Sequence, residues 1–98
     1  MTLLEKARNV INEADAQIAE SFEKRMHAAE DVIAYKMENG LPIFDEAREK
    51  EVIERNLAKI TDEKLKPYYE DMLIQLMRIS KKYQKAILEE NNRSDTAD

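Results

Sequence analysis

The chain has 98 residues, of which 43% are hydrophobic, 38% are charged and one is glycine, a composition typical of a single helix-bundle domain. Its net charge of −5 argues against nucleic acid as a partner, and its lack of cysteine excludes disulfides and thiolate metal ligands. No apolar run approaches the roughly 18–20 residues that span a bilayer, so we expect a cytoplasmic protein without a membrane partner.

The first predicted helix is long and runs from Leu3 to about Glu38, where Asn39-Gly40 followed by Pro42 is a typical helix end. At ~1.5 Å per residue it is about 54 Å long, which exceeds the width of a compact domain of this size. One of its seven-residue columns has mostly small side chains: Ala7, Ala14, Ser21, Ala28 and Tyr35. We therefore expect an intertwined antiparallel homodimer built on paired first helices; a self-contained three-helix hairpin is the alternative.

Two further helices follow. Asp45 is a suitable N-cap for a helix over about 46–60, and after a break with room for one helical turn a third helix is predicted over about 67–90. Their inward faces are predicted from the apolar spacing as Glu49, Val52, Ile53, Leu57 and Ile60, then Tyr69, Leu73, Leu76, Met77, Ser80, Gln84 and Ile87. The predicted organisation is an all-α domain over residues 1–90 and a disordered polar tail over residues 91–98.

Several charged and polar side chains fall where the apolar pattern predicts core. The column Leu4, Ile11, Ile18, Arg25, Val32 places a cation in the middle of an aliphatic stripe. Burying an unpaired cation is costly, so such a residue needs an anionic partner. Only two carboxylates, Asp15 and Glu49, are predicted to point inward, against four cations: Arg8, Arg25, Lys36 and Arg48. This surplus of positive charge predicts an anionic ligand, most simply one with two carboxylates.

The geometry of the first predicted helix separates Arg8 from the other two inward cations on that helix, Arg25 and Lys36. Arg25 and Lys36 share a face about 16 Å apart along the axis, whereas Arg8 lies about 25 Å before Arg25 and reaches the same ligand only from an antiparallel partner helix. Each residue alone has a structural explanation: a cation is usually exposed or ion-paired, and Glu49 can pair with its neighbours. No nucleophile–base pair, phosphate-binding glycine loop or metal-ligand cluster is visible, so neither a metal nor a cofactor is expected.

Four segments together resemble the all-helical (AroQ-type) chorismate mutases: Arg25-Met26, Val32-Ile33-Ala34-Tyr35-Lys36, residues 39–49 (NGLPIFDEARE) and Ser80-Lys81-Lys82-Tyr83-Gln84. The resemblance covers residues 4–88, and its most specific part is the spacing Lys36…Asp45-x-x-Arg48-Glu49. The first helix departs from the usual pattern at Ala7, Ala14 and Asn12, where the family more often has larger aliphatic or acidic residues.

The resemblance implies a homodimeric enzyme, without a cofactor, that rearranges chorismate to prephenate for phenylalanine and tyrosine synthesis. It implies electrostatic preorganisation rather than covalent or acid–base catalysis. The implied roles are carboxylate binding by Arg25 and the partner's Arg8, with Arg48 and Lys36 completing the cationic pocket; hydrogen bonds from Lys36 and Gln84 to the ether oxygen; acceptance by Glu49 from the ring hydroxyl; secondary polar contacts from Asp45 and Ser80; and an apolar wall from Val32 and Met77.

Two alternative functions stay open. Isochorismate pyruvate-lyase uses the same fold and a similar cationic pocket, although the Asp45-x-x-Arg48-Glu49 run favours the mutase. A helical dimerisation module without chemistry is the other alternative, but it gives no reason for cations in surplus on inward faces. Because 98 residues leave no room for a fused second domain, a monofunctional enzyme is expected.

Overall fold

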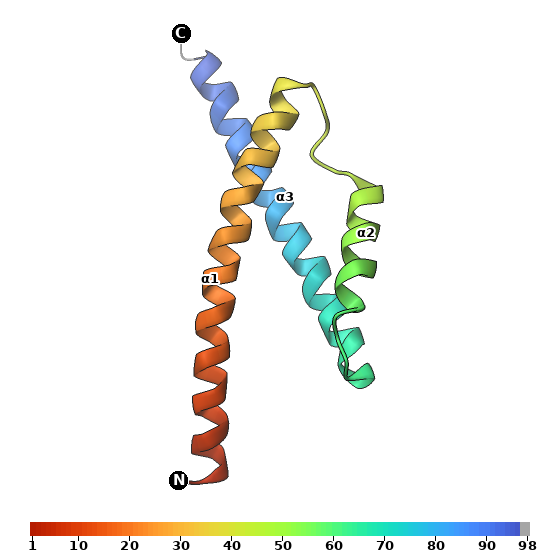
Figure 1. Cartoon of the computed structure of the whole chain (residues 1–98). Coiled ribbons are helices and arrows are strands. Elements are labelled where there is room, and N and C mark those ends of the chain that lie inside the picture. Colours follow the sequence, from red (N-terminus) through yellow and green to blue (C-terminus); the bar gives the residue numbers. More distant parts are fainter. Residues whose placement is uncertain (97–98) are drawn as a thin grey trace.

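The computed structural model describes residues 1–96, which form three α-helices and a short 3-10 turn (Figure 1). The elements are α1 (Leu3–Glu38), α2 (Glu46–Leu57), η1 (Glu63–Leu65) and α3 (Lys66–Thr96). The all-α class with one very long helix is therefore confirmed, and η1 occupies the predicted break. In the same residues, no helix is both long and apolar enough to cross a membrane.

Two helix ends differ from the prediction. α2 ends at Leu57 rather than near residue 60, because the chain turns there with the Lys59 amide bonded to the Asn56 carbonyl. α3 continues past residue 90 to Thr96, and the added segment contains neither glycine nor proline to stop it. Residues 97–98 of the predicted disordered tail lie outside the described residues, and the division into domain and tail stays a prediction.

Local hydrogen bonds explain where α1 ends and α2 begins. Gly40 has a φ of +65°, and the Leu41 amide donates to the Lys36 carbonyl at 2.9 Å, so the chain leaves α1 through a left-handed glycine. The side chain of Asp45 accepts from the Arg48 amide at 3.1 Å and caps α2. Both features were predicted from the sequence, and together they fix the length of the connecting loop.

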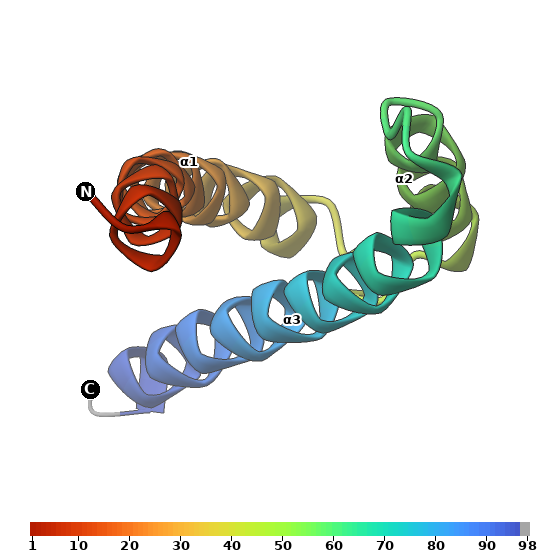
Figure 2. The same cartoon turned by 90° about the horizontal axis from the view of Figure 1, so that it is seen from below.

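α3 is the centre of the packing. Among the described residues, the backbones of α1 and α2 each come close to α3 but not to each other; Figures 1 and 2 show α1 crossing α3 and α2 lying beside the N-terminal part of α3. The buried side chains are Ala29 and Ile33 on α1 and Leu73, Met77, Ser80 and Gln84 on α3. The predicted inward face of α3 is therefore confirmed, whereas α2 contributes only half-buried side chains.

The N-terminal half of α1 lies away from the other helices (Figure 1). Every residue from 3 to 24 is exposed, including Leu4 at 56%, Ile11 at 54% and Ile18 at 60%. The column predicted to face inward is thus uncovered within one chain, because the residues of α1 that are buried against α3, Ala29 and Ile33, lie in the other half of the helix. The extents are 62 × 28 × 15 Å. The radius of gyration is 17.6 Å, against about 13 Å for a compact chain of this length, and the extended shape is consistent with a dimer.

Candidate active site

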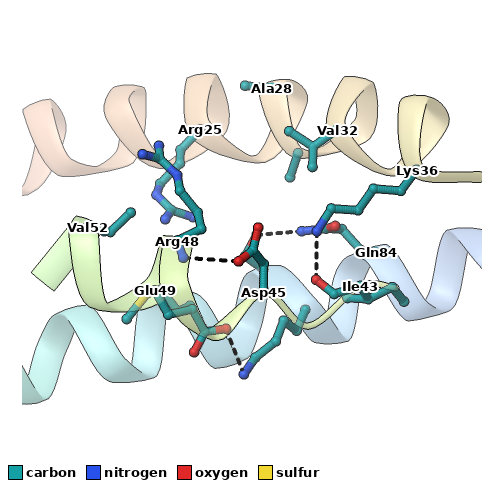
Figure 3. A pocket seen from close by; sticks show the side chains of 14 residues that line it. Arg25, Ala28, Val32, Lys36, Ile43, Asp45, Arg48, Glu49, Val52 and Gln84 are labelled. Atoms are coloured by element: carbon teal, nitrogen blue, oxygen red, sulfur yellow. Dashed lines mark hydrogen bonds and ion pairs between the residues drawn. The ribbon is translucent and has the colours of Figure 1, made fainter. Parts of the chain in front are cut away.

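A cavity of about 250 Å³ lies between α1, the 39–45 loop, α2 and α3. Its lining includes all the predicted site residues except Arg8: Arg25, Val32, Lys36, Asp45, Arg48, Glu49, Met77, Ser80 and Gln84. Figure 3 shows the side chains from α1 and from α2 with its preceding loop pointing toward one another across this space. The fold therefore brings together residues from four segments, and their individual roles stay predictions.

Arg25 is half-buried and lies beside a second guanidinium, that of Arg48 (Figure 3). Burial, and to a lesser degree the positive charge of Arg48, lower the pKa of Arg25 from its ordinary value. Both effects disfavour the charged form of a side chain that stays charged at working pH. The charge of a bound anion would offset both penalties, so this corner of the cavity favours an anionic ligand.

Arg48 has a partner at the rim of the cavity. Its Nη1 lies 3.2 Å from Glu51 Oε1, and Glu51 also pairs with Arg55, one turn further along α2. The Arg48 and Glu51 side chains are 55% and 50% exposed, so water screens their attraction and the pair is weak. Arg48 is therefore free to exchange Glu51 for a ligand at little cost.

Lys36 lies at the opposite end of the cavity from Arg25 (Figure 3). Its Nζ donates to the Ile43 carbonyl at 2.7 Å, which ties the last turn of α1 to the 39–45 loop. The Ile43 carbonyl is a neutral acceptor, so it directs the ammonium without neutralising its charge. An ammonium has three N–H donors, and the Ile43 carbonyl uses one of them.

Lys81 also lines the cavity, although it was not predicted from the sequence as a site residue. Its Nζ lies 2.9 Å from Glu49 Oε2, marked by the dashed line at Glu49 in Figure 3, and 4.8 Å from the centre of the Phe44 ring. Lys81 follows Ser80 directly and precedes Gln84 by three residues, so its place beside the predicted polar stripe of α3 was a usable signal. Ala28, Ala29, Ile43 and Val52 also line the cavity and were not predicted as site residues.

Ser80 and Gln84 form a buried polar pair on α3, at 7% and 6% exposure. The Gln84 amide nitrogen donates to Ser80 Oγ at 3.1 Å, and Gln84 Oε1 is buried without a hydrogen-bond partner in the described part of the chain. A half-turn of the amide lets the Ser80 hydroxyl donate to Oε1 and releases the amide N–H groups, since a hydroxyl both donates and accepts. An unpaired buried polar atom costs about 1–3 kcal/mol, and this one lies beside the cavity.

The charges around the cavity do not balance. Arg25, Lys36, Arg48 and Lys81 are opposed by two lining carboxylates, those of Asp45 and Glu49. This leaves a surplus of two positive charges in a chain whose net charge is −5. Arg8 is not among the lining residues and lies on the exposed half of α1. The arrangement suits a small dianion.

Comparison with known proteins assigns the family. No curated protein and no solved structure gave a match. The model of the family described as chorismate mutase type II matches residues 7–85, a range that spans the polar residues of the cavity and most of the three helices. With this match over most of its length and a cationic cavity within it, the chain belongs to the chorismate mutase type II family.

Proposed function

We propose that this protein is a chorismate mutase, which rearranges chorismate to prephenate in a single intramolecular step. The observation that carries the proposal is the surplus of two positive charges around a cavity of small-molecule size. Chorismate carries two carboxylates, so its charge complements that surplus. The family match supports the same substrate independently of the charges.

The residues around the cavity suit distinct parts of this substrate. Arg25 and Arg48 are the binding groups for its carboxylates, because a guanidinium pairs with a carboxylate through two parallel N–H donors. Lys36 and Gln84 donate to the ether oxygen. Glu49 accepts from the ring hydroxyl. Four further residues complete the binding surface: Asp45 and Ser80 with polar contacts, and Val32 and Met77 with apolar ones.

This chemistry needs no nucleophile and no proton transfer, because one carbon–oxygen bond breaks as one carbon–carbon bond forms within the same molecule. Negative charge develops on the ether oxygen as its bond to carbon lengthens. Donors that already point at that oxygen stabilise the transition state more than the ground state. A cavity that fits the compact reactive conformer of the substrate also holds it in that shape, which removes part of the entropic barrier.

The active form in this proposal is an antiparallel homodimer with two equivalent sites. The exposed apolar column of α1 gives the second chain a surface to cover. A second hollow of about 500 Å³ lies between α1 and α3 and is lined mainly by apolar residues: Ala14, Ile18, Phe22, Tyr69, Met72, Leu76 and Ile79. In this arrangement the partner's Arg8 completes the carboxylate site, because Arg8 lies too far along α1 to serve the cavity of its own chain.

The test is conversion of chorismate by the purified full chain, followed as loss of the chorismate ultraviolet band with the product identified by mass spectrometry and proton NMR. Prephenate as the product supports the proposal. A folded protein that leaves chorismate unchanged would contradict it. Release of pyruvate from isochorismate, without formation of prephenate from chorismate, would assign the lyase activity instead.

A further inference from the structure

Lys81 lies where three segments of the chain meet. It belongs to α3, its ammonium pairs with Glu49 on α2 at 2.9 Å, and the ring of Phe44 in the 39–45 loop covers the same ammonium at 4.8 Å. An ammonium over an aromatic face is attracted by the ring, so both contacts hold the Lys81 side chain in one direction. The two neighbours of Lys81 come from segments that carry site residues.

The Lys81–Glu49 pair differs from the other ion pairs of α2. Those pairs join residues three or four apart on α2 itself, and the Arg48–Glu51 side chains are 55% and 50% exposed. Lys81 and Glu49 are 35% and 25% exposed and join two helices. Because half-buried charges are screened less by water, this pair fixes the carboxylate of Glu49 more firmly than a pair within one exposed helix face.

We propose that Lys81 is a positioning residue that holds one oxygen of the Glu49 carboxylate and leaves the other to accept from the ring hydroxyl of the substrate. This inference rests on the proposed function. Without Lys81, the Glu49 side chain would sample several rotamers and would have to be ordered by each arriving substrate molecule, at a cost in binding and in rate.

A direct bond from Lys81 to the substrate is the competing explanation, since Lys81 also lines the cavity. The two explanations differ in what Lys81 does once Glu49 has lost its charge. If Lys81 acts through Glu49, replacing both residues costs no more than replacing Glu49 alone. If Lys81 binds the substrate itself, the two losses multiply.

The test compares kcat and KM for chorismate in the full-length wild type, Lys81→Met, Lys81→Arg, Glu49→Gln and the Lys81→Met/Glu49→Gln double variant. Lys82→Met is the matched control, because Lys82 is exposed on the same helix and does not line the cavity. We expect Lys81→Met to lower kcat/KM about 10- to 100-fold, the range for a lost hydrogen bond to a charged group. Lys82→Met should stay within about twofold of the wild type.

We expect the kcat/KM of the double variant to lie within about twofold of that of Glu49→Gln. Lys81→Arg should retain most of the activity, because it keeps a positive charge beside the Glu49 carboxylate. Multiplied losses in the double variant, or a Lys81→Met enzyme as active as the Lys82→Met control, would overturn the inference while the proposed function stands. A folded wild type that does not convert chorismate would overturn the proposed function and this inference with it. Circular dichroism checks each fold, and Lys81→Gln replaces Lys81→Met if that variant does not fold.

Discussion

The two halves of α1 have the same kinds of residues but very different surroundings. Residues 3–24 are exposed throughout, although they include aliphatic side chains at helical spacing. The second half, from Arg25 to Glu38, packs on α3 through the buried residues Ala29 and Ile33 and supplies two cations to the cavity. The boundary between the halves falls at Arg25, which lines both the cationic cavity and the apolar hollow.

An apolar stripe on a helix therefore predicts a covered face without identifying the chain that covers it. Fully burying one aliphatic side chain stabilises a protein by about 1.5–3 kcal/mol, so leaving several of them in water is unfavourable. The second half of α1 obtains that stabilisation within its own chain. The first half obtains it from a second copy in the proposed dimer.

The largest effect is expected in the second half of α1, at Lys36. Lys36→Ala removes the proposed donor to the ether oxygen, and loss of one such donor typically lowers kcat by about 10²–10³. Steady-state kinetics with chorismate measures the loss, with Lys82→Ala as the control for removal of an exposed lysine. Near-normal turnover by a folded Lys36→Ala protein would contradict the proposed mechanism.

The substitution Arg8→Ala tests whether the first half of α1 contributes a side chain to the active site of another chain. We expect Arg8→Ala to lower kcat/KM by about 10- to 100-fold, the cost of a lost charge-assisted hydrogen bond. Mixing it with Lys36→Ala should restore activity, because each heterodimer then has one site with both side chains intact. At equal amounts and full exchange, about a quarter of the wild-type activity returns. If the mixture is no more active than its components, Arg8 does not act from a second chain.

The substitution Ile11→Ala tests, through the free energy of unfolding, whether a second chain covers the first half of α1. Ile11 is 54% exposed in one chain, where truncation to alanine would change the free energy of unfolding by about 0.5 kcal/mol or less. If a partner helix buries it, Ile11→Ala costs about 2–5 kcal/mol. Urea unfolding at several protein concentrations distinguishes the two values. Leu65→Ala, at a residue of η1 that is 48% exposed, provides the comparison.

The smallest effect is expected at a hydrogen bond between α1 and α3. Tyr83 donates to Glu30 Oε2 at 2.6 Å. This bond is the main reason why the pKa of Tyr83 is raised above 10.0; partial burial and the negative charges of Glu30 and Glu90 raise it further. A raised pKa means that folding favours the protonated phenol. The bond therefore contributes fully below the unfolded pKa and is lost as the pH rises through the folded value.

Tyr83→Phe should accordingly lower the thermal midpoint slightly, by the same amount at weakly acidic and weakly basic pH. The difference from wild type should shrink in strong alkali, where the phenol ionises. Differential scanning calorimetry at three pH values measures this. A difference that grows with alkali would show that the hydroxyl has another role.

Much of the fold was predictable because it depends on local chemistry. Gly40 ends α1 through its left-handed backbone conformation, and Asp45 begins α2 as its N-cap. Both roles were predicted from the sequence. The inward face of α3 was predictable for a similar reason, since seven positions at helical spacing agree. The continuation of α3 to Thr96 was not, because a polar segment without glycine or proline is equally compatible with helix and with disorder.

The parts that were not predictable depend on how helices cross. Ile33 is the most buried side chain at 1% exposure, whereas its neighbour Val32 is 44% exposed, and the crossing of α3 over α1 decides between them. The Lys81–Glu49 contact likewise depends on where α2 lies along α3. Spacing along one helix cannot supply either relation. Arg25 was predictable because it breaks an apolar column of its own helix, whereas Lys81 breaks no such pattern and was missed.

The bond from Lys36 to the Ile43 carbonyl has a consequence for the entropy of binding. A free lysine side chain rotates about four bonds, and immobilising it costs up to about 2 kcal/mol. Here the loop carbonyl restrains those rotations during folding, before any ligand arrives. A ligand that bonds to the remaining N–H groups of Lys36 therefore meets an ammonium whose direction is already set. The short loop after α1 thus makes a flexible side chain behave as a rigid donor.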